Sequence, residues 1–324
     1  MAQGIFNLDK ADIKILQALE RNSRQPNKAI ARKAGVNEHV VAYRIQRMLK
    51  EGVIRKIFCI VNRGLLFPVG YRIFLRFQNL SKEKENALIR RAVECRFTNW
   101  VVLCRGHWDM VISMFVNDPG HFQELFNGII GGFEDFVQEK EVVNYLEMAD
   151  FNRAYLYGGE PTEMLEYDGK FRHTEADALD WKILEQLSTN SRMPTAEIAK
   201  NFGVSPDTIR NRINSLEKKK LILGHSVWLN LKKIGLNYYT ILLNLKDLSK
   251  EREKALHSFA LQHRNVIFWV RTIGAYDLNI EIEIGETKLD EFVAELRNKF
   301  GDIIKNMEVL TIKDEFKYTY LTQK

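Results

Sequence analysis

Apolar residues recur at intervals of three and four near the start of the chain, and again in its second half. The segments DKADIKILQAL (9–19) and DALDWKILEQL (177–187) each carry such a stripe behind an Asp-x-x-Asp start. An Asp at the N-cap, with an acid three residues later, suits the free amides and the positive end of a helix. Both segments are therefore predicted to be amphipathic helices.

Two further helices are predicted in each half. A short helix begins at Pro26 or Pro194, where the missing proline N–H is tolerated, and ends at a glycine, the residue favoured just past a helix. A third helix lies within GVNEHVVAYRI (35–45) and GVSPDTIRNRI (203–213), where an Asn or a Ser stands at the N-cap. Two helices joined by a short glycine-containing turn are typical of a helix-turn-helix.

The last helix of a helix-turn-helix presents the residues off its apolar stripe to the major groove of DNA. Arg can bind guanine, Asn can bind adenine, and Ser or Thr can hold a phosphate. The third helix of the second copy has the more polar exposed face, so we expect it to make the stronger contacts with DNA bases. The predicted DNA-binding residues are Asn37, His39, Tyr43, Arg44, Gln46 and Arg47 in the first copy, and Ser205, Thr208, Arg210, Asn211, Arg212 and Asn214 in the second.

Strand-like segments follow each helix-turn-helix. VGYRIFLRF (69–77) and YYTILLNLK (238–246) are rich in aromatic and branched residues, and the elements after them give the order βαββαβ, a ferredoxin-like pattern. In YDLNIEIEI (276–284) apolar and polar residues alternate, which predicts one apolar and one polar face. The second face of WDMVISMFV (108–116) is mostly apolar, so we expect the sheets to pair face to face.

The two halves of the chain are copies of one unit. Adding 168 to a residue number carries NSR (22–24) onto NSR (190–192), and LSKE (80–83) onto LSKE (248–251), without a gap. One offset that holds through both the helical and the strand-like parts excludes a chance match, and it loosens only near the last strands. The sequence therefore predicts an α+β fold that is built twice.

Composition narrows the functional classes. A formal net charge of +6 and a pI near 9.0 permit a nucleic-acid partner without requiring one. The chain has no long uncharged apolar run and no signal-peptide pattern, so no membrane contact is expected. Cys59, Cys95 and Cys104 fit a reducing cytoplasm better than a disulfide framework. No cofactor is expected, because GIIGGF (128–133) lacks the phosphate-loop pattern and Cys104 with His107 lacks a second pair at metal spacing.

The segments LDKADIKILQAL (8–19) with GHWD (106–109), and LDWKILEQLS (179–188) with GAYD (274–277), resemble the leucine-responsive (Lrp/AsnC) family of transcription regulators. The resemblance covers nearly the whole chain, twice. It implies in each copy a winged helix-turn-helix followed by a ferredoxin-like (RAM-type) domain for ligand binding and assembly. Family members usually carry one such unit and form dimers and larger rings. This chain is therefore expected to bind double-stranded DNA as an intrachain pseudo-dimer or a homo-oligomer.

The resemblance also implies domains and an effector site. The helix-turn-helix domains are predicted at 1–62 and 176–230, the ligand and assembly domains at 63–157 and 231–324, and a linker at 158–175. A small effector, often an amino acid, is implied near the glycine turn at an interface between sheets. Glycine permits close backbone approach, and the aspartate could pair with an ammonium group or simply cap the turn. The implied effector-binding residues are Gly106, His107, Trp108, Asp109, Gly274, Ala275, Tyr276 and Asp277.

Three functions stay open on the sequence alone. The leading prediction is a sequence-specific transcription regulator that is not an enzyme. Its rival is an enzyme like the siroheme decarboxylases, which have the same two-part build and are sometimes fused in pairs. Such an enzyme would need His, Arg and Tyr residues around a tetrapyrrole cavity, yet none of the seven histidines lies on VGYRIFLRF or YYTILLNLK. The third is a ligand-sensing scaffold in which the first helix-turn-helix no longer touches DNA.

Overall fold

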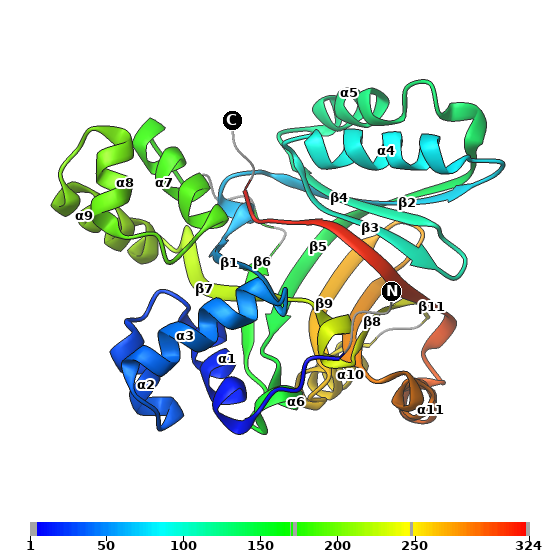
Figure 1. Ribbon diagram of the computed structural model, residues 1–324. Helices are drawn as coiled ribbons and strands as arrows, with labels where there is room; N and C mark the ends of the chain where they lie inside the picture. The colour runs from blue at the N-terminus through cyan, green and yellow to red at the C-terminus, as the bar shows by residue number, and fades with distance from the viewer. Residues whose placement is uncertain (1–4, 169, 171–173, 247–248, 322–324) are drawn as a thin grey trace.

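The computed structural model describes residues 5–168, 170, 174–246 and 249–321, and the same order of elements occurs in both halves (Figure 1). The first half contains α1 (Lys10–Asn22), α2 (Asn27–Ala34), α3 (Glu38–Lys50), β1 (Ile54–Val61), β2 (Val69–Phe77), α4 (Lys82–Glu94), β3 (Thr98–Arg105), β4 (Met110–Val116), α5 (Pro119–Ile130) and β5 (Val137–Phe151). The second half contains α7 (Ala178–Thr189), α8 (Thr195–Phe202), α9 (Pro206–Lys218), β7 (Ile222–Leu229), β8 (Asn237–Leu245), α10 (Lys250–Gln262), β9 (Val266–Ile273), β10 (Leu278–Ile284), α11 (Leu289–Phe300) and β11 (Ile304–Tyr318). Between the halves lie α6 (Ala154–Tyr157) and β6 (Glu163–Tyr167).

The helix-turn-helix domains form as their capping residues dictate. The side chains of Asp9 and Asp177 accept hydrogen bonds from the amides two and three residues later, and complete capping boxes at the starts of α1 and α7. Gly35 and Gly203 end α2 and α8 in the left-handed conformation, with φ angles of 72° and 66°. The sequence signals for these helices are therefore confirmed.

The strands β1 and β7 join the two copies. They pair antiparallel with each other, so that each is the wing strand of a helix-turn-helix domain. Helix α1 packs against β7 of the other copy, and α7 packs against β1. The apolar cores of the two helix-turn-helix domains each include side chains from the exchanged strand. The two domains are thus a single packed unit.

The remaining strands, apart from β6, close into a ring. Their order is β2-β4-β3-β11-β8-β10-β9-β5, and β5 pairs again with β2. The long strands β5 and β11 each pair with their own copy in their first half and with the other copy in their second half. The two ferredoxin-like sheets therefore share their edges and face each other across a common interior. The predicted α+β fold, with βαββαβ order in each copy, is confirmed.

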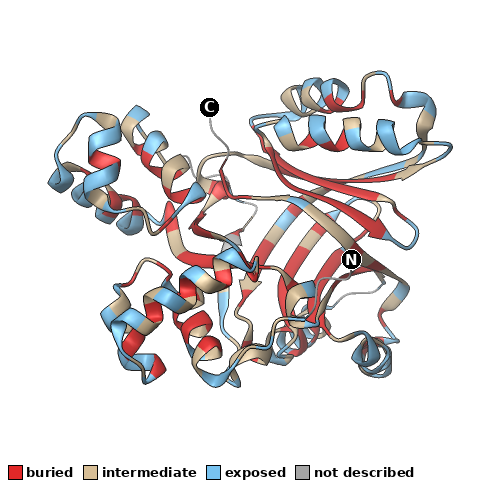
Figure 2. Cartoon of the chain, viewed as in Figure 1, coloured by how far each residue is buried: buried red, intermediate tan, exposed pale blue. Residues whose placement is uncertain are grey.

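Helices cover the outside of this closed sheet. Helices α4 and α5 lie over the first copy's strands, and α10 and α11 lie over the second copy's strands (Figures 1 and 2). The inner face is less apolar than a usual core. The alternating polar residues Asn279, Glu281 and Glu283 of β10 are buried, so the predicted polar face of this strand points inward and not to solvent.

The segment predicted as a linker contains regular structure. Strand β6 pairs antiparallel with the end of β5, and the Tyr167 side chain is buried. Residues 169 and 171–173 of this segment lie outside the described residues. The connection between the copies is therefore anchored to the closed sheet along part of its length.

Candidate nucleic-acid interface and ligand sites

Helix α9 of the second copy has a firm start and an exposed polar face. The Ser205 hydroxyl accepts a hydrogen bond from the Thr208 amide at 3.0 Å, and the two hydroxyls lie 2.9 Å apart. Arg210, Asn211 and Asn214 are exposed. Arg210 forms an ion pair with Asp207 one turn earlier, but exposed pairs of this kind are weak and screened by salt. These side chains are free to reorient toward a nucleic acid.

Helix α3 of the first copy presents a different face. Asn37 caps the helix by accepting a hydrogen bond from the Val40 amide at 2.9 Å. His39 and Gln46 are exposed, and the Tyr43 ring is 67% exposed, which is unusual for a large aromatic side chain. This face can stack a ring or donate from a hydroxyl, but it carries less charge than that of α9. Both helix-turn-helix domains project at the end of the molecule opposite α4 and α11 (Figure 1).

Three of the arginines predicted to bind DNA are engaged within their own domains. Arg44 bonds the Asp9 and Asp12 carboxylates at 2.7 and 2.8 Å, and Arg47 bonds Asp12 at 2.7 Å. Arg212 forms the matching pairs in the second copy with the capping aspartates of α7. These arginines tie the third helix to the first, so the structure gives them a scaffold role that the sequence pattern did not reveal.

The glycine turns lie where the two copies touch. A Cβ atom on Gly106 would come within 2.9 Å of the Val309 carbonyl, and one on Gly274 would come within 2.8 Å of the Val142 carbonyl. Both glycines have φ angles near +135°, namely 136° and 133°, which other residues rarely adopt. The turn of each ferredoxin-like domain therefore needs glycine because it approaches the backbone of the other copy.

The aspartates of both turns hold strand ends. One carboxylate oxygen of Asp109 accepts a hydrogen bond from the Phe77 amide at 2.8 Å, and one of Asp277 accepts from the Leu245 amide at 2.7 Å. These contacts are those of a cap, the alternative to pairing with a ligand ammonium group. Ala275 adds a carbonyl that accepts from a neighbouring amide side chain.

The aromatic residues of the two turns meet each other. The Trp108 indole donates to the Tyr276 hydroxyl at 2.8 Å, and that hydroxyl donates to Glu308 at 2.9 Å. Burial raises the pKa of Tyr276, so the hydroxyl stays protonated. His107 is exposed and lies 2.8 Å from Glu139. The eight residues of the predicted effector site therefore gather into two neighbouring turns, joined by the Trp108–Tyr276 bond.

A polar network inside the closed sheet was missed by the sequence analysis. Arg72 of β2 lies 2.8 Å from Glu281 of β10, with side chains only 5% and 3% exposed. The Arg72 guanidinium also donates to the Tyr145 hydroxyl at 3.1 Å. Burial alone would lower the pKa of Arg72, but Tyr145 and Glu281 outweigh it and raise that pKa. The pocket beside this network measures about 20 Å³, which is room for about one water molecule.

The described part of the chain contains neither a candidate metal site nor a helix that could span a membrane. Cys104 is buried while His107 is exposed, and no group of three or more His, Cys, Asp or Glu side chains there is placed to hold a metal ion. The helices among the described residues all lack the length and apolar character needed to span a bilayer.

The helix-turn-helix segments match known protein families. Residues 8–55 match the winged helix-turn-helix DNA-binding family, and residues 177–217 match the AsnC-type helix-turn-helix domain. The two matches fall on the two copies found by the 168-residue offset. A tandem pair of such domains is thereby confirmed independently of the internal repeat.

Curated relatives match one copy at a time. The regulatory protein AsnC of Haemophilus influenzae is 32% identical over 106 residues, which are 33% of this chain and 70% of that protein. The transcriptional regulator Ptr1 of Methanocaldococcus jannaschii is 32% identical over 37% of this chain and 80% of that protein. The regulator LrpA of Pyrococcus horikoshii is 43% identical, but the match spans 20% of this chain and 46% of that protein.

Two solved structures resemble nearly the whole chain. Crystal structures of the siroheme decarboxylase NirDL, one with an iron-uroporphyrin III analogue, cover 96–97% of this chain with TM-scores of 0.63 and 0.62. The prediction that this chain is not an enzyme is contradicted by this finding, because an enzyme shares the fold of nearly the whole chain. At 12% and 13% sequence identity the likeness shows the fold alone.

Proposed function

Because the chain belongs to the Lrp/AsnC family of transcription regulators, we propose that it binds double-stranded DNA and regulates transcription, with both DNA-binding domains supplied by one chain. The observation that carries the proposal is the pairing of β1 with β7. It packs two helix-turn-helix domains into one unit with a recognition helix on each side. This is the arrangement that a dimer of single-unit members would need in order to place two helices on DNA.

In this proposal the two recognition helices contribute unequally to DNA binding. Arg210, Asn211 and Asn214 on α9 supply the base-reading contacts, and Ser205 with Thr208 lies where a phosphate can be held. On α3, Tyr43 and Gln46 make a weaker or different set of contacts. The operator is therefore asymmetric. The net charge of +6 assists the approach to DNA.

The proposal also includes the binding of a small effector molecule. It would bind beside the two glycine turns, where Trp108 and Tyr276 connect the copies. The aspartates there already hold backbone amides, so a ligand would be recognised through the turn carbonyls and the exposed His107 as well. The three free cysteines fit a protein that works in the reducing cytoplasm.

Electrophoretic mobility shifts against genomic fragments, at several salt concentrations, test the DNA-binding proposal. Replacing Arg210 and Asn211 by Ala should remove specific retardation, because both side chains are assigned to base contacts, and should leave weaker salt-dependent binding to all fragments. The matched control is Arg90→Ala with Asn86→Ala, two exposed residues on α4 at the far side of the molecule. No salt-dependent retardation of any fragment by the unaltered protein would refute DNA binding.

A second candidate function is tetrapyrrole decarboxylation, favoured by the end-to-end likeness to NirDL. The interior around Arg72 and Glu281 offers only about 20 Å³, so a macrocycle would have to bind elsewhere or open the closed sheet. Addition of siroheme to the protein, followed by absorbance and by chromatography of the pigment, tests this candidate. A shifted spectrum with loss of carboxyl groups from the pigment would establish it.

A further inference from the structure

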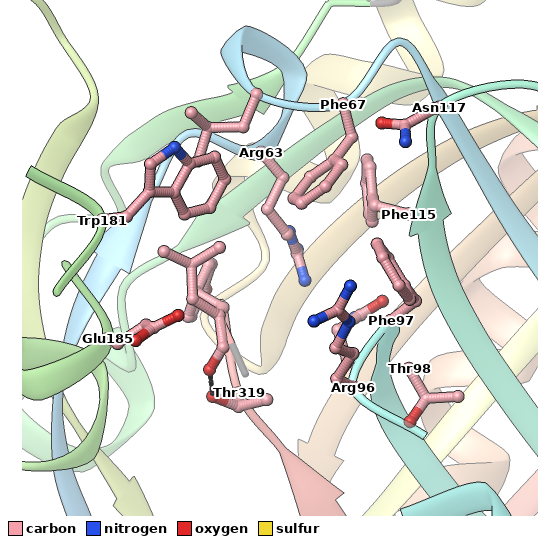
Figure 3. A pocket seen from close by; sticks show the side chains of 14 residues that line it. Arg63, Phe67, Arg96, Phe97, Thr98, Phe115, Asn117, Trp181, Glu185 and Thr319 are labelled. Carbon is pink, nitrogen blue, oxygen red and sulfur yellow. Dashed lines mark hydrogen bonds between the residues drawn. The ribbon is translucent and has the colours of Figure 1, made fainter. Parts of the chain in front are cut away.

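A cavity of about 230 Å³ lies where the second helix-turn-helix domain meets the closed sheet (Figure 3). Its walls come from α7, from β3 and β4, from the turn after β1 and from the segment that follows β11. A smaller apolar cavity, of about 150 Å³, is already able to hold a benzene ring in another protein. This cavity therefore has room for a small ring or a short chain with a polar group.

Aromatic side chains form the apolar part of the cavity. The Phe67 ring lies with its centroid 6.2 Å from that of Phe97 and 6.1 Å from that of Trp181. Figure 3 shows Phe67, Phe97 and Trp181 around the same space. These rings are in edge-to-face contact with one another and form an apolar wall of the cavity, against which a ring or an aliphatic chain can pack.

Two cations face the same space. Arg63 is only 5% exposed, and its guanidinium lies 4.6 Å from the Phe115 ring centroid and 4.7 Å from that of Tyr320. Arg96 is exposed at the rim and lies over the Phe97 ring. Among the residues that line the cavity, Glu185 is the acid. The exposed cation at the rim of the cavity is therefore Arg96.

A buried polar group also borders the cavity. The Asn99 side chain is 9% exposed, and its Oδ1 has no hydrogen-bond partner within the described part of the chain. Buried polar atoms are nearly always bonded, so this atom is placed to accept a hydrogen bond from a water or from a bound molecule. The amide can offer an oxygen or an N–H to that molecule.

The duplicated position in the other copy is closed by an ion-pair network. There Arg153 bonds Glu20 of α1 at 3.0 Å and Glu283 of β10 at 2.8 Å, and thereby ties the first helix-turn-helix to the sheet. The Tyr155 hydroxyl adds a bond to Glu283. The 168-residue offset places Leu321, Ser188 and Phe115 at the positions of Arg153, Glu20 and Glu283. The network is thus replaced in the second junction by a serine and two apolar side chains, and Phe115 and Leu321 line the cavity.

We propose that this cavity binds a small monoanion with an apolar ring or chain, such as an aromatic carboxylate. The carboxylate meets Arg96 at the rim, and the ring lies against Phe67, Phe97 and Trp181. The bound molecule connects α7 to the sheet, as Arg153 connects α1 to the sheet in the first copy. This inference is independent of DNA binding, since the site is complete in the protein alone.

Isothermal titration of the full chain with phenylacetate tests the proposal. Saturable binding with one site per chain is expected, and phenylacetamide, which has the same ring without the charge, should bind at least about tenfold more weakly. Arg96→Gln should weaken phenylacetate binding by a similar factor. Arg264→Gln is the matched control, because Arg264 is the exposed counterpart of Arg96 in the other copy.

A second pair of variants locates the binding. Thr319→Phe installs the residue found at the counterpart position, Phe151, and should fill the cavity and abolish binding. Thr319→Val removes only the hydroxyl and should leave binding within a factor of two or so. The proposal is overturned by absence of saturable phenylacetate binding, by equal affinity for acid and amide, or by binding that survives Thr319→Phe in a folded protein.

Discussion

The hydroxyl groups of Ser23 and Ser191 lie 2.7 Å apart, and both side chains are buried. The two residues are separated by 168 positions, the offset that relates the copies. Arg24 donates to the Ser191 and Met193 carbonyls, and Arg192 donates in the same way across the contact. A residue that meets its own duplicate marks an axis of pseudo-twofold symmetry. The two DNA-binding domains are therefore held as the halves of a dimer within one chain.

The same axis passes through the closed sheet. Trp108 and Tyr276 are also 168 positions apart, and they hydrogen-bond to each other. One contact thus relates the DNA-binding domains, and the other relates the ferredoxin-like domains. A ligand that moved one copy against the other would have to change both contacts.

The buried carboxylate of Asp12 anchors α3 of the first copy. Its side chain is fully buried and bonds Arg44 and Arg47. We expect Asp12→Asn to lower the free energy of unfolding by about 2 kcal/mol, less than for a fully buried pair because the arginines are partly exposed. Urea unfolding followed by circular dichroism measures the change. Asp207→Asn, which breaks the exposed pair with Arg210, should change stability by less than about 0.5 kcal/mol.

The approach of the second turn to β5 requires a glycine. Gly274→Ala would place a methyl group 2.8 Å from the Val142 carbonyl, at a φ angle of 133°. We expect a loss of about 1–3 kcal/mol in the free energy of unfolding. Gly285→Ala is the control, because its added Cβ meets nothing within 4 Å and its φ is −67°. Equal effects of the two substitutions in thermal unfolding would show that the turn does not press on β5.

The ion pair of Arg72 with Glu281 lies between the two sheets. We expect Arg72→Met alone to cost about 3–5 kcal/mol, because it leaves the Glu281 carboxylate buried without its cation. The double variant Arg72→Met with Glu281→Leu should recover most of that loss, since two apolar side chains replace the pair. Chemical unfolding of both variants measures the two changes in the free energy of unfolding. A double variant no more stable than the single one would contradict the pairing.

The pH dependence of stability should report His225. Burial, with a smaller effect of Arg24, lowers the pKa of this histidine to about 4, even though Glu217 lies 3.6 Å away. The unfolded chain takes up a proton near pH 6.5 while the folded protein does not, so stability falls as the pH drops from about 6.5 to about 4. Over this pH range the free energy of unfolding should fall by about 3 kcal/mol.

Replacement of the histidine checks this account. His225→Gln should flatten the acid limb of a plot of unfolding free energy against pH, whereas His39→Gln, at an exposed position, should leave the limb unchanged. An unchanged slope in His225→Gln would mean that another group sets the acid limit.

The sequence predicted the parts of the fold that local chemistry controls. Asp9, Gly35 and the Ser205–Pro206 start mark helix ends through bonds to their own neighbours, and the structure forms those helices. The internal repeat predicted the architecture, because two copies of one unit have the same order of helices and strands. The likeness to an enzyme over the whole chain could only be suggested from the sequence, because at 12–13% identity it lies in the tandem fold and not in a local pattern of residues.

Long-range pairing is what the sequence could not show. Arg44 sits on the surface stripe of α3, yet its partners lie on α1, so its scaffold role depends on how the helices cross. The alternation in β10 revealed a polar face, but only closure of the ring turns Glu281 toward Arg72 in the other copy. The cavity beside Trp181 likewise exists only because α7 meets the closed sheet.

Selection of bound DNA from a random pool tests whether one chain reads DNA as a pseudo-dimer. We expect an enriched sequence with two unlike half-sites about one helical turn, roughly 34–36 Å, apart. The stronger half-site should disappear with Arg210→Ala and Asn211→Ala. A pool that shows no enrichment over its input, at low as well as moderate salt, would contradict the account.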